Sequence, residues 1–310
     1  MRILLLGRTG QVGWELNRSL IPLGEVVAPS RADADFSSPE SLRQIVRAVD
    51  AEVIVNAVAY TAVDKAETDE PLANLINADA PAVLAEEAIR SNGLLVHYST
   101  DYVFDGLKTS PYSEEDTPNP INAYGRSKLA GDLNIQASGC QYIIFRTSWL
   151  YSSRGQNFVE TILRLAEQHD ELRIVSDQIG APTSARFIAD VTANVLTKIR
   201  PRSRLSACEV GEIYHLTSSN YTSWHGFAEM VFSACNYSLL NARMPPRLIS
   251  IPSEQSRLRA PRPKNSRLSC EKIVREFGVN LPNWERCVRL LFDELASSNA
   301  SIENYAAGLR

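Results

Sequence analysis

Residues 2–13 read RILLLGRTGQVG: an apolar run, a glycine-rich turn and the start of a helical pattern. Gly7, Gly10 and Gly13 have GxxGxxG spacing directly after the apolar run. Such a turn brings backbone N–H groups and a helix N-terminus close to a pyrophosphate, and a Cβ would obstruct that approach. Glycines also mark ordinary turns, but a triplet between a strand and a helix is typical of a dinucleotide-binding site. The residues that we expect to bind the cofactor here are Gly7, Thr9, Gly10, Gln11, Val12 and Gly13.

The sequence that follows alternates short apolar runs with helical stretches up to about residue 150. This alternation indicates βαβ units, and therefore a parallel sheet with helices on both faces. We predict an α/β protein with a Rossmann-type doubly wound parallel sheet and a smaller α/β substrate-binding domain. The predicted parts are a dinucleotide-binding domain at 1–150 with part of 185–212, a substrate-binding domain at 151–298, and a tail at 299–310.

Composition narrows the possible partners. The chain has 310 residues and a formal net charge of −4, with a pI near 5.7, which argues against nucleic acid or an acidic membrane as the main partner. No apolar run is long enough to span a bilayer, and the first residues are too short an apolar stretch for a signal peptide. The five cysteines include no CxxC pair, which fits a reducing cytoplasm better than a disulfide framework.

The end of the second predicted strand indicates which nicotinamide cofactor is used. An acidic residue there would bind the ribose 2′-hydroxyl of NAD. The chain has Ser30 and Arg31 at this place, and Arg31 can pair with a 2′-phosphate, so we predict NADPH, with NADH as the open alternative. Asp35 and Phe36 follow closely and suit the amino group and the face of an adenine.

A tyrosine and a lysine four residues apart suggest the chemistry. Tyr124 and Lys128, in AYGRSK at 123–128, share one face if this segment is helical. A nearby cation stabilises phenolate, so we expect a lowered tyrosine pKa and a general acid at Tyr124. Thr100 ends a predicted strand, where ligands of doubly wound sheets gather. We predict ketone reduction with Tyr124, Lys128 and Thr100 as catalytic residues: Thr100 orients the carbonyl, Tyr124 protonates the alkoxide, and Lys128 also binds the nicotinamide ribose.

Taken together, these motifs resemble the extended short-chain dehydrogenase/reductases and, more narrowly, the dTDP-4-dehydrorhamnose reductase family. The segments that carry the resemblance are GRTGQVGWEL, VNAVAYTAVDKAE, HYSTDYVFDG, YGRSKLAGD, FRTSWLY, DQIGAPTSA, TSWHGFAEMVF and RPKNSRL. The resemblance implies NADPH-dependent reduction of the 4-keto group of dTDP-4-dehydro-L-rhamnose to dTDP-L-rhamnose. It also implies further site residues: Ala59, Tyr60 and Thr61 beside the cofactor, and Thr100, Asp101 and Trp149 beside the substrate.

Several polar residues have weaker interpretations. Arg259, Arg262 and Lys264 form a basic loop that either grips a diphosphate or is simply solvated. Asp64 looks like part of a helix-start ion-pair cluster with Lys65 and Glu67 rather than a catalytic group. His97 lies in an apolar run and is predicted to be a packed strand residue rather than a ligand.

The resemblance also raises the question of a metal and a dimer. Members of the family place acidic residues at a magnesium-linked dimer contact. Glu15 and Glu294 match such positions, but Arg186 stands where a further acid is expected. We therefore predict no metal there and expect Arg186 to pair with an acid directly. The chain is then a homodimer without metal, or a monomer.

Two other functions stay open from the sequence. One is an NADP-binding regulatory subunit that resembles the beta subunit of methionine adenosyltransferase. Such a subunit can keep Thr100, Tyr124 and Lys128, so only a turnover assay separates it from an enzyme. The other is an epimerase of the same superfamily. Epimerases usually carry the NAD-type acid on the second strand, which this chain lacks.

Overall fold

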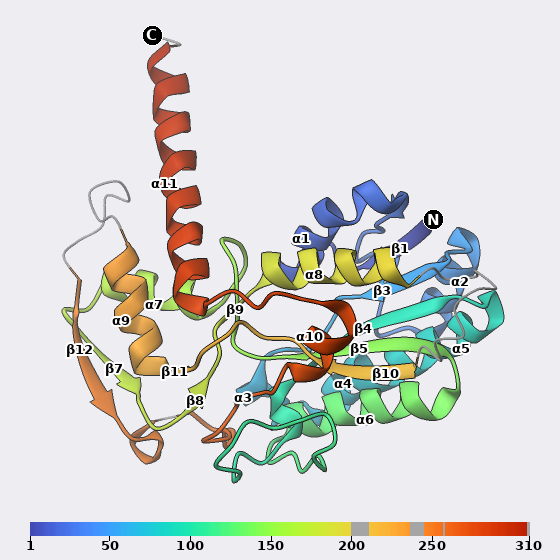
Figure 1. Ribbon diagram of the computed structural model, residues 1–310, viewed down its shortest axis with the longest axis horizontal. Coiled ribbons are helices and arrows are strands. Elements are labelled where there is room, and N and C mark those ends of the chain that lie inside the picture. The colour runs from blue at the N-terminus through green and yellow to red at the C-terminus, as the bar shows by residue number, and fades with distance from the viewer. Residues whose placement is uncertain (200–210, 236–244, 257, 309–310) are drawn as a thin grey trace.

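A six-stranded parallel sheet forms the centre of the protein in a computed structural model that describes residues 1–199, 211–235, 245–256 and 258–308 (Figure 1). The strand order is β10-β5-β4-β3-β1-β2, so the connections wind outward in both directions from the centre. The strands are β1 (Arg2–Leu6), β2 (Glu25–Val27), β3 (Val53–Asn56), β4 (Leu94–Thr100), β5 (Gln141–Thr147) and β10 (Gly211–His215). This topology confirms the predicted fold class.

The apolar runs form strands because both faces of this sheet are covered. Along β1, Ile3 and Leu5 pack into one hydrophobic cluster, whereas Leu4 and Leu6 pack into another on the opposite face. All four of these side chains are fully buried. A continuous apolar strand is what a parallel sheet between two helical layers requires.

Helices cover the two faces of the sheet. On one face, α1 (Gln11–Ser19) packs against α8 (Ala185–Lys198), and α10 (Glu271–Phe277) joins the same cluster. On the other face lie α2 (Pro39–Val49), α5 (Ala80–Ser91) and α6 (Ala123–Ser138) (Figure 1). Ser38 caps α2 by accepting a hydrogen bond from the Ser41 amide, as its position before the helix predicts.

A second, smaller group of elements has its own hydrophobic core, built around Tyr151, Phe227 and Trp284. Its strands are β6 (Leu150–Tyr151), β7 (Glu171–Val175), β8 (Ile179–Gly180), β9 (Thr183–Ser184), β11 (Thr222–Ser223) and β12 (Arg247–Ile251). Its helices are α7 (Phe158–Ala166), α9 (Trp224–Ala234) and α11 (Trp284–Gly308). It lies beside the carboxyl ends of the central strands (Figure 1).

The chain crosses between these two groups more than once. After β6 it returns to the sheet through α8 and β10, then leaves it and comes back once more at α10. The predicted domain boundaries stay a prediction, and residues 200–210 of the segment 185–212 lie outside the described residues. The predicted tail at 299–310 also stays a prediction; α11 continues through Gly308 and projects from the body (Figure 1).

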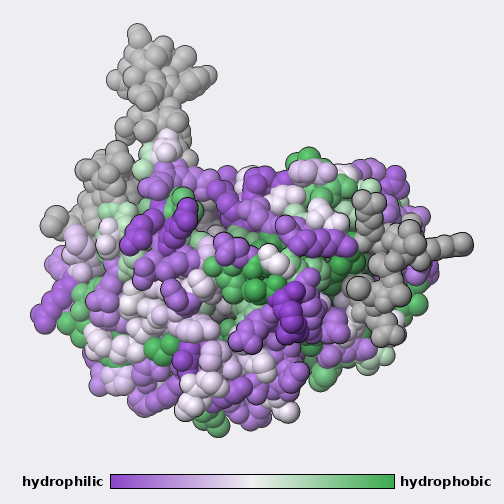
Figure 2. Space-filling model, viewed as in Figure 1, coloured by the Kyte–Doolittle hydropathy of each residue, from purple (hydrophilic) through white to green (hydrophobic). Residues whose placement is uncertain are grey.

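The surface is that of a chain with scattered exposed apolar side chains. Figure 2 shows hydrophobic areas interspersed among hydrophilic ones on the face seen in Figure 1. Leu107, Ile21 and Leu290 are among the exposed large hydrophobic residues, and they come from separate elements. Among the described residues, no helix combines the length and the apolar character needed to cross a membrane.

Candidate active site

A cavity of about 500 Å³ opens beside the glycine turn, where β1, β2 and β3 end. Ten of the residues predicted to bind the cofactor line it: Gly7, Thr9, Gly10, Ser30, Arg31, Asp35, Phe36, Ala59, Tyr60 and Thr61. The sequence interpretation missed part of the wall, including Leu72 and Ile76, because an apolar pair at helical spacing reads as core. Gln11, Val12 and Gly13 are not in this wall.

The glycines of the turn are required by its geometry. Gly7 has φ of +88°, which favours glycine, and its carbonyl accepts a hydrogen bond of 3.0 Å from the Gly10 amide. A Cβ on Gly13 would lie only 2.0 Å from the Gly7 carbonyl oxygen. Helix α1 begins directly after the turn, so its first amides face the cavity side. This is a cradle for an anionic group that any larger residue would distort.

Gln11 has a role that the glycine pattern did not indicate. Its side-chain carbonyl accepts hydrogen bonds from Ser152 Oγ at 2.9 Å and from Asn157 Nδ2 at 3.1 Å. Asn157 also caps α7, because its Oδ1 accepts from the Glu160 amide. The first turn of α1 is thus tied to the loop that starts the smaller group of elements.

The residues that follow the second strand line the cavity, and they differ in exposure and in hydrogen bonding. Arg31 is exposed at its edge, whereas Phe36 is buried. The Asp35 carboxylate accepts hydrogen bonds from the amide and hydroxyl of Ser37, at 2.8 and 2.6 Å, and these bonds lower the pKa of Asp35. Asp35 therefore stays ionised and fixed in place.

The loop after β3 is held by a buried amide. Asn77 sits in a π-helical turn (Leu75–Asp79), accepts from the Tyr60 amide at 2.8 Å and donates to the Tyr60 carbonyl at 3.0 Å. It also donates to Ser127 Oγ, which in turn donates to the Tyr124 carbonyl. Asn77 therefore joins the cofactor-side loop to the helix that carries Tyr124, which sequence patterns alone did not reveal.

Tyr124 and Thr100 meet at the end of β4. Tyr124 is in the first turn of α6, which Asn122 caps through a 2.7 Å hydrogen bond from the Gly125 amide to Asn122 Oδ1. The Tyr124 hydroxyl shares a hydrogen bond with Thr100, and its ring meets Tyr102 edge-on at 5.9 Å. Two hydroxyls thus converge at the sheet edge where a substrate carbonyl is expected.

The expected drop in the tyrosine pKa is not found. Burial raises the pKa of Tyr124 above its ordinary value, and the negative charges of Asp101 and Asp132 add to the rise. Lys128 Nζ binds β4 instead, 3.0 Å from His97 Nε2 and 2.7 Å from the Tyr98 carbonyl oxygen. Burial lowers the pKa of Lys128 to about 8. The (i, i+4) spacing is right, but a fully buried amine turns to the polar groups of the strand below it.

Asp101 is a buried acid at the same edge. Its Oδ1 accepts from Thr100 Oγ1 at 3.1 Å, and Ser266 also hydrogen-bonds to it. Its Oδ2 has no hydrogen-bond partner among the described residues. Burial raises the pKa of Asp101 to about 7. The carboxyl group is thus available to a ligand in the predicted substrate region.

The basic loop is anchored by Asp64. Arg262 Nη2 lies 2.8 Å from Asp64 Oδ2, and the amides of Arg259 and Ala260 donate to Asp64 Oδ1. The predicted local ion-pair cluster at the helix start is therefore wrong, since the partner of Asp64 is almost two hundred residues away. Lys264 pairs with Asp177 and Glu254. Arg262 and Lys264, two cations of the predicted diphosphate-binding loop, are thus paired with acids of the chain. Diphosphate binding by this loop stays a prediction.

Trp149 has an unusual backbone and a large aromatic partner. Its φ is +46°, and its ring stacks on Trp224 with centroids 3.6 Å apart. A Cβ on Gly180 would lie 2.5 Å from the Trp149 ring, so Gly180 makes room for this indole. Trp149 is buried between these two residues, and its predicted substrate contact stays a prediction.

The predicted pairing of Arg186 is confirmed. Arg186 Nε lies 3.2 Å from Glu15 Oε2, and Nη2 lies 2.8 Å from Glu294 Oε1. The guanidinium joins α1, α8 and α11 and places a cation between the two acids. No group of three metal-ligating side chains occurs in the part of the chain that the structure describes. The predicted homodimer stays a prediction.

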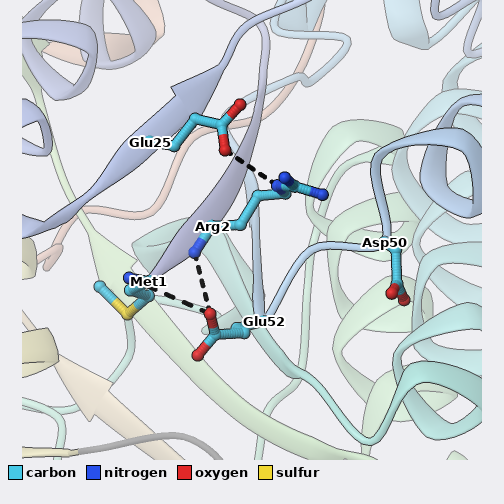
Figure 3. Close-up of a pocket in the computed structure, with 5 residues that line it drawn as sticks. All are labelled: Met1, Arg2, Glu25, Asp50 and Glu52. Atoms are coloured by element: carbon cyan, nitrogen blue, oxygen red, sulfur yellow. Dashed lines mark hydrogen bonds and ion pairs between the residues drawn. The ribbon is translucent and has the colours of Figure 1, made fainter.

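A cavity of about 400 Å³ lies at the opposite, amino-terminal edge of the sheet (Figure 3). Four of its charged groups lie close to a group of opposite charge: Arg2 Nε pairs with Glu25, and Glu52 accepts from the Arg2 amide and lies 4.0 Å from the amino group of Met1. Ligands of doubly wound sheets gather at the carboxyl ends of the strands, so this cavity is not the candidate site.

Comparisons with known proteins agree on one family. The model of the RmlD substrate binding domain matches residues 1–297. A dTDP-4-dehydrorhamnose reductase of Burkholderia thailandensis is 47% identical over 96% of this chain and 100% of its own length. One of Escherichia coli is 41% identical, over 97% and 100%. A crystal structure of the Bacillus anthracis dTDP-4-dehydrorhamnose reductase in complex with NADP has a TM-score of 0.83 and 32% identity, covering 94% of this chain and 99% of that one.

Proposed function

Since the chain belongs to the RmlD family, we propose that it reduces the 4-keto group of dTDP-4-dehydro-L-rhamnose, giving dTDP-L-rhamnose. The chain is an NAD(P)H-dependent oxidoreductase. The observation that carries the proposed reaction is the meeting of the Thr100 and Tyr124 hydroxyls at the end of β4. Tyr124 packs on the same small alanine cluster as Tyr60 of the dinucleotide cavity. Cofactor and substrate regions therefore adjoin.

The residues present fit NADPH. The cradle formed by Gly7 and Gly13, which a Cβ would fill, suits a pyrophosphate at the start of α1. Arg31 at the cavity edge supplies a cation for a 2′-phosphate, and buried Phe36 supplies a flat apolar wall for an adenine. When bound, the reduced nicotinamide supplies a hydride to the carbonyl carbon of the substrate.

The chain's own side chains then complete the reduction. The Thr100 hydroxyl turns its one hydrogen from Asp101 Oδ1 to the carbonyl oxygen of the bound substrate and orients it. Tyr124 transfers its phenolic proton to that oxygen as negative charge develops. The raised pKa of Tyr124 keeps the phenol protonated at neutral pH, which suits an acid. Asp101, buried beside Thr100 with one oxygen free of partners among the described residues, is placed to bind a sugar hydroxyl.

The decisive assay follows NADPH absorbance with enzymatically made dTDP-4-dehydro-L-rhamnose. We expect NADPH oxidation that depends on this substrate, with dTDP-L-rhamnose as the product by mass and chromatography. A chain that binds NADPH but oxidises none of it would instead support the regulatory-subunit alternative.

Arg31→Ala is expected to weaken NADPH binding by about ten- to a hundredfold and to leave NADH binding within about twofold, because only NADPH carries the 2′-phosphate that a guanidinium binds. Titration of both cofactors by quenching of protein fluorescence measures the two affinities. Arg154→Ala is a matched control, since this exposed arginine stacks on Trp14 and does not line the cavity. Unchanged NADPH affinity in Arg31→Ala would remove Arg31 from cofactor choice.

A further inference from the structure

A buried chain of hydrogen bonds runs from the cofactor cavity to Lys128. Val58, which lines the cavity, donates its amide hydrogen to Asn56 Oδ1 at 3.1 Å. Asn56 Nδ2 lies 3.0 Å from His97 Nδ1, and His97 Nε2 lies 3.0 Å from Lys128 Nζ. Asn56 and His97 are paired neighbours on β3 and β4. Asn56, His97 and Lys128 are each at most 1% exposed.

The hydrogen bond from the Val58 amide determines which group donates and which accepts in each of the other hydrogen bonds. A backbone amide can only donate, so the oxygen of Asn56 must face Val58 and its NH₂ group must face His97. His97 Nδ1 therefore accepts, and a neutral imidazole then carries its hydrogen on Nε2. Burial lowers the pKa of His97 well below its ordinary value, which keeps the ring neutral. The Nε2–H group consequently donates to Lys128 Nζ. An ammonium has no lone pair to accept this hydrogen bond, so the Lys128 side chain is an uncharged amine when the bond forms.

The other contacts of Lys128 are consistent with a hydrogen bond donated from His97 Nε2 to Lys128 Nζ. Its Nζ donates to the Tyr98 carbonyl oxygen at 2.7 Å, which an uncharged amine can do while accepting from His97. The acid whose charge raises the pKa of Lys128 is Asp132 of the same helix, and it is itself engaged by Arg146 at 3.2 Å and by Ser99 at 2.8 Å. The charge that would favour an ammonium is thus already largely neutralised.

We propose that His97 is a positioning residue that keeps its hydrogen on Nε2 and thereby holds the Lys128 amine uncharged against β4 in the free enzyme at mildly alkaline pH. This proposal rests on the proposed function in one respect: the predicted binding of the nicotinamide ribose by Lys128 requires an ammonium. Loading of the enzyme with NADPH then takes up one proton from solvent, which forms a bond to Lys128 Nζ. Asn56 and His97 couple the wall of the cofactor cavity to the charge of this lysine.

The first test uses the free protein and needs no turnover, so it is independent of the proposed reaction. Imidazole ¹⁵N chemical shifts distinguish the two neutral tautomers from the charged ring, and His97→Gln assigns the His97 signal by its disappearance. We expect the Nε2–H tautomer at a pH about one unit above 8, where Lys128 is mostly uncharged. A His97 ring with its hydrogen on Nδ1, or a charged ring, would overturn the proposal.

The second test reverses the donor and acceptor roles in this network of hydrogen bonds. In Asn56→Asp both carboxylate oxygens accept, one from the Val58 amide and one from His97 Nδ1–H, so Nε2 becomes an acceptor and Lys128 becomes an ammonium before cofactor binds. Calorimetric NADPH titrations in buffers of different ionisation enthalpy give the proton uptake at a pH about one unit above 8, where Lys128 is otherwise mostly uncharged. We expect about one proton per NADPH for the unaltered protein and less than half of that for Asn56→Asp.

Asn134→Asp is the matched control, because it adds the same charge on α6 at a side chain that donates to the Ala78 carbonyl and has no part in the network of Asn56, His97 and Lys128. Its proton uptake should equal that of the unaltered protein. Equal proton uptake on NADPH binding in Asn56→Asp and in the unaltered protein would overturn the proposal. If Asn56→Asp does not fold, the tautomer of the unaltered protein still decides the question.

Discussion

Tyr124→Phe is expected to lower kcat by a factor of about 10² to 10⁴, the range for loss of a positioned general acid. The physical reason is that the hydroxyl which meets Thr100 is the proton source for the developing alkoxide. The ring itself remains, so its edge contact with Tyr102 at 5.9 Å and its packing on the alanine cluster are retained. The variant should therefore fold and should bind NADPH within about twofold of the unaltered affinity.

Initial rates at saturating NADPH and substrate measure this effect, and thermal unfolding measures retention of the fold. Tyr214→Phe is a suitable control because it also removes a tyrosine hydroxyl. That hydroxyl donates a 2.6 Å hydrogen bond to Glu276, and Tyr214 lies on the edge strand β10. Its kcat should stay within about twofold. A Tyr124→Phe enzyme that keeps a third or more of the original kcat would rule out Tyr124 as the proton donor.

The parts of the fold that were predictable depend on local signals. Strand β1, the turn and helix α1 are adjacent in the chain, and the apolar run, the glycine spacing and the helical pattern each specify their own geometry. The end of β4 is local too, so Thr100 could be placed at the carboxyl edge of the sheet from its position after an apolar run. The two hydroxyls were brought together by topology that the βαβ pattern implies.

The parts that were not predictable depend on which distant groups share a buried space. Lys128 was expected to face Tyr124 four residues away, yet its hydrogen-bond partners are on β4, about thirty residues back. Asp64 was expected to pair within its helix, yet Arg262 reaches it from the far part of the chain. In both cases a buried polar group takes the partner that satisfies its hydrogen bonds, and sequence spacing carries no record of that partner.

The same principle predicts a large effect on stability at the buried ion pair beneath the active site. Arg146 Nε lies 3.2 Å from Asp132 Oδ2, and the two side chains are 3% and 0% exposed. Arg146→Leu removes the cation but leaves the Asp132 carboxyl group in the core, with Ser99 as its remaining hydrogen-bond donor among the described residues. Breaking a buried pair from one side costs about 3–5 kcal/mol of unfolding free energy. Chemical denaturation at neutral pH measures the loss.

The pH dependence of that loss identifies its cause. Burial already raises the pKa of Asp132, and the charge of Arg146 opposes the rise, so Arg146→Leu raises it further. A carboxyl whose folded-state pKa exceeds its unfolded value binds its proton more tightly in the folded state, so it destabilises the fold increasingly as pH rises between those two values. The gap between variant and unaltered protein should therefore narrow as pH falls toward about 4, the unfolded pKa of Asp.

Two further variants separate buried charge from loss of the arginine side chain. The double variant Arg146→Leu/Asp132→Asn has no stranded charge and should recover at least about half of the lost stability. Arg164→Leu removes the cation of an (i, i+4) pair with Glu160 in which both side chains are about half exposed, 50% and 46%, and should cost less than about 1 kcal/mol. If Arg146→Leu costs no more than Arg164→Leu, then the fold accommodates the Asp132 carboxyl without the guanidinium, and the buried pair adds nothing to the stability of the fold.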